Sequence, residues 1–175
     1  DNIDALRIAL ELKKEQILSK QQVQALKRYS GFGGLKAVLY PNASKDEWIK
    51  LKASKGDLKL HPQMMELHQL LQKYLNEAEY KQAIDSVKNS ILTAYYTPLV
   101  IPQTLFRVLK EQGIEPKTMY EPSGGAGVFV IEADAAFPGM DMITVVEKDV
   151  LTGRVLAALK ESVTVPVALK VQGFE

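Results

Sequence analysis

The sequence predicts an α/β fold in which a partial parallel sheet follows an all-α region. Two observations support this prediction. Residues 1–90 carry apolar side chains at helical spacing between helix-capping signals. Residues 91–175 change period and alternate short apolar runs with helical segments, as βαβ units do. We therefore expect a helical amino-terminal region over 1–90 and a sheet domain over 91–175.

Capping signals locate helices in the first region. Ser19 with Gln22, and Ser44 with Glu47, have the spacing of capping boxes. Pro62 suits the first turn of another helix. A last helix is expected over about 77–89, from its apolar periodicity.

Residues 29–35, Tyr-Ser-Gly-Phe-Gly-Gly-Leu, interrupt these helices with three glycines in four positions. One interpretation is a turn that needs positive φ and packs under Phe32. The other is a loop whose backbone approaches a ligand or a nucleic acid. Composition favours the turn.

The second region should begin with a helix from Pro98 that Gly113 closes. Its expected apolar face comprises Leu99, Ile101, Leu105, Val108 and Leu109. The elements expected next are a strand at about 118–121, a helix at 126–136, a strand at 141–147, a helix at 150–160 with Asp149 as N-cap, and a strand at 167–172. A ligand should lie at the carboxyl ends of these strands.

The most informative stretch is residues 121–129, Glu-Pro-Ser-Gly-Gly-Ala-Gly-Val-Phe, which ends the first expected strand in a glycine-rich turn. A second acid, Glu147, ends the next strand. This order is typical of the nucleotide-binding half of a Rossmann-like unit. The glycines let the backbone approach a ligand, and Glu147 can accept hydrogen bonds from two ribose hydroxyls.

The amino-acid sequence of the turn limits which class of ligand it can bind. Gly125 and Gly127 lack the third glycine of a dinucleotide fingerprint, and no Gly-Lys-Ser/Thr of a triphosphate loop is present. The leading acid, Glu121, suits a ligand with a positive amino group. S-adenosyl-L-methionine (SAM) has that group, an adenosine ribose and no phosphates. The alternative is a turn that only packs a helix on a sheet, and the two acids favour the cofactor.

Composition excludes several classes of function. The chain has 175 residues, of which 46% are hydrophobic and 25% charged, as in ordinary globular proteins. Without cysteine there are no disulfides or thiolate metal sites, and His61 and His68 have no third ligand nearby, so no metal is expected. No apolar run approaches the ~20 residues of a membrane span. The chain starts at Asp1 rather than methionine and stops within an informative pattern, so we expect a fragment of a longer protein.

Charge is unevenly distributed although the net value is only +1. Residues 1–90 hold 15 lysines and arginines against 11 acidic residues, and residues 91–175 hold 7 against 10. The densest basic cluster is Lys50, Lys52, Lys55 and Lys59. A solvated helical surface is the favoured interpretation. The alternative is weak, non-specific contact with DNA phosphates.

Four segments together resemble adenine-specific DNA methyltransferases, especially the large methylase or methylase-helicase proteins of bacterial mobile elements. Ala-Tyr-Tyr-Thr-Pro at 94–98 resembles the Tyr-Thr-Pro motif of that class. Residues 121–129 resemble its first SAM motif, and Val-Glu-Lys-Asp at 146–149 resembles its second. Tyr-Ser-Gly-Phe-Gly-Gly at 29–34 resembles a segment found upstream in the large members, and its role is open.

The resemblance implies a Rossmann-like SAM-dependent methyltransferase fold and assigns roles by position. Thr97 and the backbone around Tyr96 would contact the methionine carboxylate, and Glu121 the amino group. Glu147 would hold the ribose, and Lys148 would flank the adenine. The cofactor-binding positions implied in this way are Tyr96, Thr97, Pro98, Glu121, Pro122, Ser123, Gly125, Gly127, Phe129, Glu147, Lys148 and Phe174. Glu175 follows the aromatic residue, whereas the acid of the third motif usually precedes it, so no role is carried over to it.

The resemblance also marks an absence. These enzymes methylate with an Asn/Asp-Pro-Pro-Tyr/Phe loop, and no two prolines are adjacent in this sequence. That loop follows the third motif, so it is expected beyond Glu175, no catalytic residue is assigned here, and we expect the chain alone not to methylate. The parent would be a cytoplasmic bacterial protein that acts on adenine flipped out of DNA, in a restriction–modification or mobile-element setting.

Two other functions stay open. The first is a non-catalytic helical adaptor on a SAM-like fold that binds DNA or a partner protein. The second is methylation of protein, RNA or a small molecule on the same fold. The Tyr96-Thr97-Pro98 motif favours DNA methylation over this second alternative.

Overall fold

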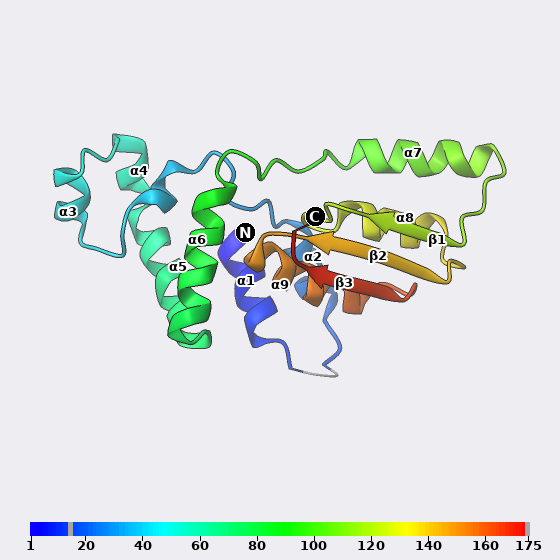
Figure 1. Cartoon of the computed structure of the whole chain (residues 1–175), viewed down its shortest axis with the longest axis horizontal. Coiled ribbons are helices and arrows are strands. Elements are labelled where there is room, and N and C mark those ends of the chain that lie inside the picture. The colour runs from blue at the N-terminus through cyan, green and yellow to red at the C-terminus, as the bar shows by residue number, and fades with distance from the viewer. Residues whose placement is uncertain (14–15, 174–175) are drawn as a thin grey trace. The chain divides into compact units, whose positions relative to one another are not determined.

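The computed structural model describes residues 1–13 and 16–173, so Phe174 and Glu175 lie outside the described residues. The protein is mixed α/β and divides into two compact units (Figure 1). The first unit combines residues 1–30 with 96–175, and the second comprises residues 31–95. Each unit is described by itself below.

The first unit contains a three-stranded parallel sheet in the order β1-β2-β3. Its strands are β1 (Thr118–Glu121), β2 (Met142–Glu147) and β3 (Val167–Val171). Their arrowheads point the same way in Figure 1, which confirms the predicted parallel sheet. The strands therefore bring the carboxyl ends of β1 and β2, with Glu121 and Glu147, to one edge.

Helices cover one face of this sheet. They are α8 (Val128–Ala136) and α9 (Val150–Leu159), followed by the 3-10 turn η2 (Lys160–Ser162). Both helices share one buried core with the same-face strand residues Ile143 and Val145. The core members are Phe106, Val130, Ala133, Phe137, Met140, Ile143, Val145, Leu156 and Val165. On the opposite face Tyr120 and Met142 are exposed, whereas Val146 is buried.

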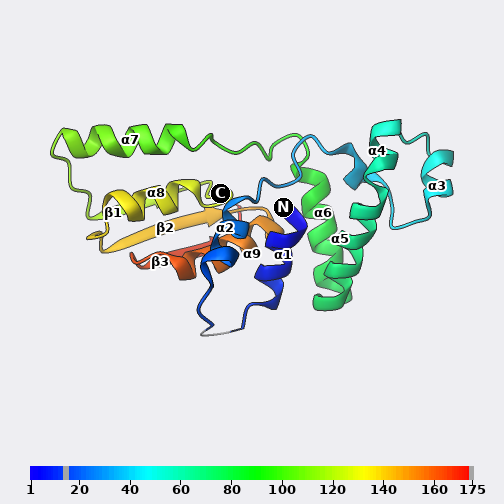
Figure 2. The ribbon, with the colours of Figure 1, turned by 180° about the vertical axis from the view of Figure 1, so that it is seen from behind.

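The amino-terminal helices belong to this unit. They are α1 (Asn2–Glu11) and α2 (Lys20–Lys27), which pack against α9 (Figure 2). Ala5, Leu6 and Leu26 are buried there. The compact units thus differ from the division at residue 90 that the sequence suggested, because α9 is apolar on two sides and buries the second side against α1 and α2.

Helix α7 (Val100–Glu111) departs from its expected packing. Leu99, Ile101, Leu105 and Val108, predicted to face the core, are 45–51% exposed. Phe106 is buried instead, with its ring edge-on to Phe129 and Phe137. Pro102 is also buried, and Leu109, the remaining member of the predicted face, packs against the core, so the helix contacts its neighbours with only part of its apolar stripe.

The second unit is all helical. Its elements are η1 (Lys36–Leu39), α3 (Lys45–Lys50), α4 (Lys55–Lys59), α5 (His61–Tyr74) and α6 (Glu77–Ser90).

The capping boxes predicted at Ser19 and Ser44 are present, and the structure adds two more at Ser54 and Asn76.

Packing explains both histidines of this unit. The His61 ring stands edge-on to the fully buried Trp48, and Nε2 lies 2.8 Å from the carbonyl oxygen of Ala43. Nδ1 of His68 lies 2.7 Å from the hydroxyl of Tyr80. Among residues 1–13 and 16–173, no group of three side chains is suited to hold a metal ion.

The glycine segment, residues 31–34, begins the second unit and forms a turn. Gly31 and Gly34 have φ values of 65° and 74°, and Phe32 is buried. The turn interpretation of the segment is therefore confirmed.

Within the described ranges, every helix is too short or too polar to cross a bilayer.

Candidate functional site

The glycine-rich turn joins β1 to α8 at the carboxyl edge of the sheet. Gly125 and Gly127 have left-handed φ values of 51° and 82°, and Gly127 is the N-cap of α8. Only glycine adopts this conformation without strain. The amide of Gly124 donates to the carbonyl of Val146 at 2.8 Å and ties the turn to β2.

The three glycines of the turn face different surroundings. A Cβ on Gly124 would lie 2.3 Å from Cγ2 of Val145, and a Cβ on Gly127 would lie 2.7 Å from Cδ1 of Leu156. These two glycines let the turn approach the protein's own core. A Cβ on Gly125 would instead lie 2.8 Å from the ring of Tyr96. Gly125 is therefore the glycine on the side of the predicted site.

Glu147 is the acid that the turn holds in place. Its Oε2 accepts a hydrogen bond from the Gly125 amide at 2.7 Å, and its Oε1 accepts one from the Asp149 amide at 2.7 Å. The side chain is only 8% exposed. Burial raises the pKa of Glu147 above its ordinary value, and the backbone amides oppose that rise.

A carboxylate has about four lone-pair sites, so Glu147 can accept a further donor beside the amides of Gly125, Lys148 and Asp149. The carbonyl of Glu147 accepts from the Gln172 amide at 2.9 Å. The backbone and side chain are thus both fixed before any ligand arrives. A pair of neighbouring hydroxyls, as on a ribose, matches this acceptor.

Tyr96 stands beside the turn. Its hydroxyl lies 3.0 Å from Oγ1 of Thr152, which is a buried residue of α9. Burial, with smaller contributions from Asp149 and Glu147, raises the pKa of Tyr96 to about 12, and the hydrogen bond with Thr152 opposes this rise. The phenol therefore stays neutral and hydrogen-bonding across the physiological range.

Tyr29 is a member of this group that sequence reasoning missed. Its hydroxyl lies 3.3 Å from the same Oγ1 of Thr152, and its ring centroid is 6.3 Å from that of Tyr96. The side chain is 3% exposed, and burial raises its pKa well above the ordinary value. The sequence did mark the segment that Tyr29 begins, but spacing alone could not pair residues 29, 96 and 152.

The other expected site residues lie around the turn and the ends of β1 and β2. Glu121 ends β1, and its Oε1 accepts from the Ser123 amide at 3.0 Å. Thr97 is half-buried next to Tyr96. Pro98, Pro122, Ser123 and Lys148 are exposed around the turn and the end of β2.

Two expected residues do not join this group. The ring of Phe129 packs edge-on to Phe106, with ring centroids 6.2 Å apart, and against the core. Phe174 was expected to meet the adenine ring and lies outside the described residues.

The start of α9 completes the arrangement. Asp149 is its N-cap and accepts from the Thr152 amide at 2.7 Å. Glu121, Glu147 and Asp149 therefore place three acidic side chains at the turn and the helix start. Such a site favours a ligand that carries positive charge and hydroxyl donors over one that carries phosphates.

Comparisons with models of protein families, with curated proteins and with solved structures returned no match.

Proposed function

We propose that this chain is the SAM-binding portion of a DNA adenine-N6 methyltransferase with a Rossmann-like fold. In that reaction SAM supplies a methyl group, already activated on its sulfonium, to the amino group of adenine. The part contributed by these residues is to bind and orient the cofactor.

One observation carries the proposal. The carboxylate of Glu147 is buried at the end of β2 and hydrogen-bonded at 2.7 Å to the amide of Gly125 in the glycine turn. A buried acid fixed against a glycine turn is a ready acceptor for ribose hydroxyls. The fixed geometry reduces the ordering cost of binding.

The charge of the site supports SAM over a dinucleotide. SAM carries a sulfonium and an ammonium group, which three nearby acids would attract. A pyrophosphate would meet the same acids unfavourably. Glu121 suits the ammonium group, and Tyr96 and Thr97 suit the carboxylate end, as the resemblance implies.

Calorimetric titration of the chain with SAM, its demethylated product and NAD tests the proposal. We expect saturable binding of the first two and none of NAD. Glu147→Ala should weaken SAM binding by about ten- to hundredfold, because it removes hydrogen bonds to a charged acceptor. Glu115→Ala, at an exposed residue before β1, is the matched control and should leave the affinity unchanged.

Circular dichroism of every variant shows that the chain is folded. A folded wild-type chain that binds neither SAM nor its product would contradict the proposal. Equal binding of SAM and NAD would contradict the argument from charge.

A specific observation favours a second candidate, in which the second unit binds DNA as an adaptor. Lys52 has φ 61°, the only non-glycine residue with positive φ in the described chain. It ends α3 in a Schellman turn, since its amide donates to Ile49 and the Ala53 amide donates to Trp48. Glycine would fit this position better, so the lysine costs roughly 1 kcal/mol of stability here.

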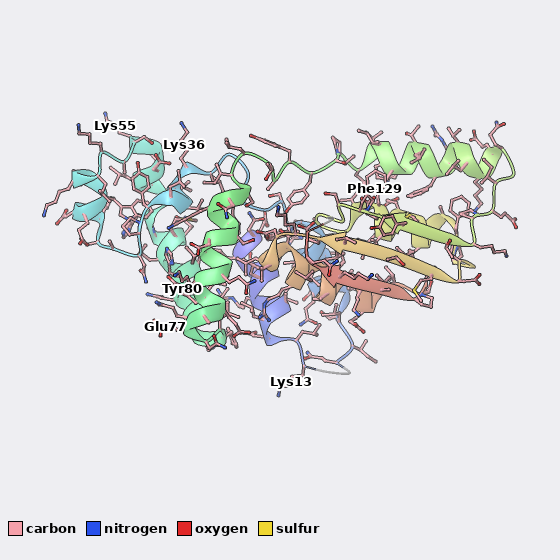
Figure 3. The ribbon with its side chains drawn as sticks, in the orientation of Figure 1. Lys13, Lys36, Lys55, Glu77, Tyr80 and Phe129 are labelled. Carbon is pink, nitrogen blue, oxygen red and sulfur yellow. The ribbon has the colours of Figure 1, made fainter. Side chains whose placement is uncertain are left out.

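Lys52 belongs to the basic cluster that the sequence marked. Lys50, Lys52, Lys55 and Lys59 are all exposed on α3, α4 and the turn between them. Lys36 is exposed on η1, and Figure 3 shows Lys36 and Lys55 projecting from the ribbon. Exposed ammonium groups of this kind contact phosphates without sequence preference.

Fluorescence anisotropy with duplex DNA over a range of salt concentrations tests the adaptor. Replacing the four lysines of the cluster by alanine should weaken binding and reduce the salt slope by about 0.9 for each phosphate that is no longer neutralised. Replacing Lys20, Lys27, Lys81 and Lys117, exposed lysines elsewhere, removes the same charge and should change the slope less. An equal reduction in both variants would show a net-charge effect and no docking surface.

A further inference from the structure

We infer that Tyr29, which begins the Tyr-Ser-Gly-Phe-Gly-Gly segment (residues 29–34), is a positioning residue that holds Tyr96 and through it the methionine end of the SAM site. The inference rests on the proposed function, because the ligand it concerns is SAM. It gives a role to a motif that the sequence left open.

The first step is a chain of three hydroxyls in the first unit. Oγ1 of Thr152 lies 3.3 Å from the Tyr29 hydroxyl and 3.0 Å from the Tyr96 hydroxyl. A threonine hydroxyl has one hydrogen to donate and two lone pairs, so it can bond to both phenols at once. Tyr29 and Thr152 are 3% and 2% exposed, so water does not compete for these bonds.

The second step connects this chain to the turn. The Tyr96 ring occupies the place that a Cβ on Gly125 would need, at 2.8 Å. The amide of the same glycine donates to Glu147. The Tyr96 ring therefore packs directly against the turn at Gly125.

The third step concerns the same segment within the second unit. The Gly34 amide donates to the carbonyl of Ile91 at 2.8 Å. A Cβ on Gly33 would lie 2.0 Å from the carbonyl oxygen of Ala94. The glycines of the segment thus pack on residues 91–94 within the second unit, whereas Tyr29 shares Thr152 with Tyr96 within the first unit.

The hydroxyl of Tyr29 is what distinguishes this role from core packing. A phenylalanine would fill nearly the same volume without a polar group to bury. Burying a hydroxyl is unfavourable unless it is hydrogen-bonded. The tyrosine is therefore useful at this position for the bond with Thr152.

Tyr29→Phe tests the inference by calorimetry with SAM, its demethylated product and 5′-methylthioadenosine, which keeps the adenosine and lacks the amino and carboxylate groups. We expect about three- to tenfold weaker binding of the first two, as for the removal of one hydrogen bond. Binding of 5′-methylthioadenosine should be unchanged, because Glu147 is untouched. Tyr95→Phe, which removes an exposed hydroxyl from the neighbouring residue, should change none of the three.

Equal weakening of all three ligands would mean a general structural effect and overturn the inference. Unchanged affinity for all three would overturn it as well. If the wild-type chain binds none of them, the proposed function fails, and hydrogen exchange without ligand separates the two failures. In that experiment Tyr29→Phe should speed exchange of the amides in residues 96 and 97 and at the start of α9, and leave α5 unchanged. No difference would overturn the positioning role itself.

Discussion

Glu147 illustrates how a single carboxylate is prepared for binding. Two backbone amides donate to it, and both bonds favour its ionised form. Burial opposes ionisation and is the larger influence, so its pKa is raised. Such a balance is common where a protein keeps an acid for a ligand rather than for its own stability.

This balance predicts a pH dependence of stability. A raised pKa means that the folded state binds a proton more readily than the unfolded state, so stability falls as pH rises from the ordinary value of 4.5 through the raised one. Glu147→Gln cannot ionise and should lack this fall. Urea unfolding of both proteins across that range measures the difference. Parallel stability curves would contradict the prediction.

The sequence predicted the positions of Glu147 and of the glycine turn, because both follow from residues that are neighbours in the chain. It did not find Thr152, which has no local signal beyond its place after the N-cap Asp149. Nor did it predict that the Phe129 ring packs against Phe106, which comes from a helix elsewhere in the sequence. Contacts between distant segments are not encoded in the spacing of either segment.

The glycine turn is the element on which the site depends. Gly124 and Gly127 bring it against Val145 and Leu156, while Gly125 leaves room for the Tyr96 ring. The glycines of the motif predicted that the backbone closely approaches a ligand. Only the tertiary structure shows that Gly124 and Gly127 approach the protein's own core, while Gly125 approaches Tyr96.

Gly124→Ala should destabilise the first unit. The added Cβ would lie 2.3 Å from Val145 and 2.9 Å from Leu156, both in the core. We expect the unfolding free energy to fall by about 1–3 kcal/mol, as for overpacked cores. Chemical denaturation followed by circular dichroism measures it.

Gly139→Ala is the matched control for this variant. Its Cβ would meet no atom within 4 Å, and its φ is not in the left-handed region. Its unfolding free energy should stay within about 0.5 kcal/mol of wild type. A similar decrease in both variants would contradict a packing role for Gly124.

Helix α7 shows where periodicity misleads. Its apolar stripe predicted a buried face, yet Leu105 and Val108 are each 45% exposed. Periodicity reports which side chains share a face of a helix, but the width of the contact depends on the neighbouring element. Here Phe106 and Leu109 pack against the core that α8 shares.

At the scale of the whole molecule, the first unit is built from two separate stretches of chain. Residues 1–30 pack on α9, whose sequence neighbours are β2 and β3. A continuous domain over residues 91–175 would expose the side of α9 that α1 and α2 cover. Secondary structure alone suggested that division, because both amino-terminal helices look like their neighbours in the second unit.

This organisation predicts the behaviour of two shortened chains. Residues 91–175 alone should bind a hydrophobic dye and unfold without cooperativity, because one side of α9 is uncovered. A chain in which about six Gly and Ser residues replace 31–95 should unfold cooperatively. The ring centroids of Tyr29 and Tyr96 are 6.3 Å apart, so the two stretches of chain lie side by side and a short flexible linker is suited to join them.

Urea unfolding and dye fluorescence of the two chains provide the comparison. Cooperative unfolding of residues 91–175 alone would contradict a structural role for α1 and α2. Failure of the linked chain to fold would show that the first unit depends on the second.

The sequence by itself determined the parallel strands, the capped helices, the glycine turn and the acid that faces it. These features follow from local rules, namely apolar period, capping residues and the conformational freedom of glycine. Tertiary structure decided that α1 and α2 cover α9, that most of the α7 stripe stays exposed, and that Tyr29, Tyr96 and Thr152 meet. Those outcomes depend on which apolar faces find each other across long stretches of chain, and burial of a face is a property of two elements together.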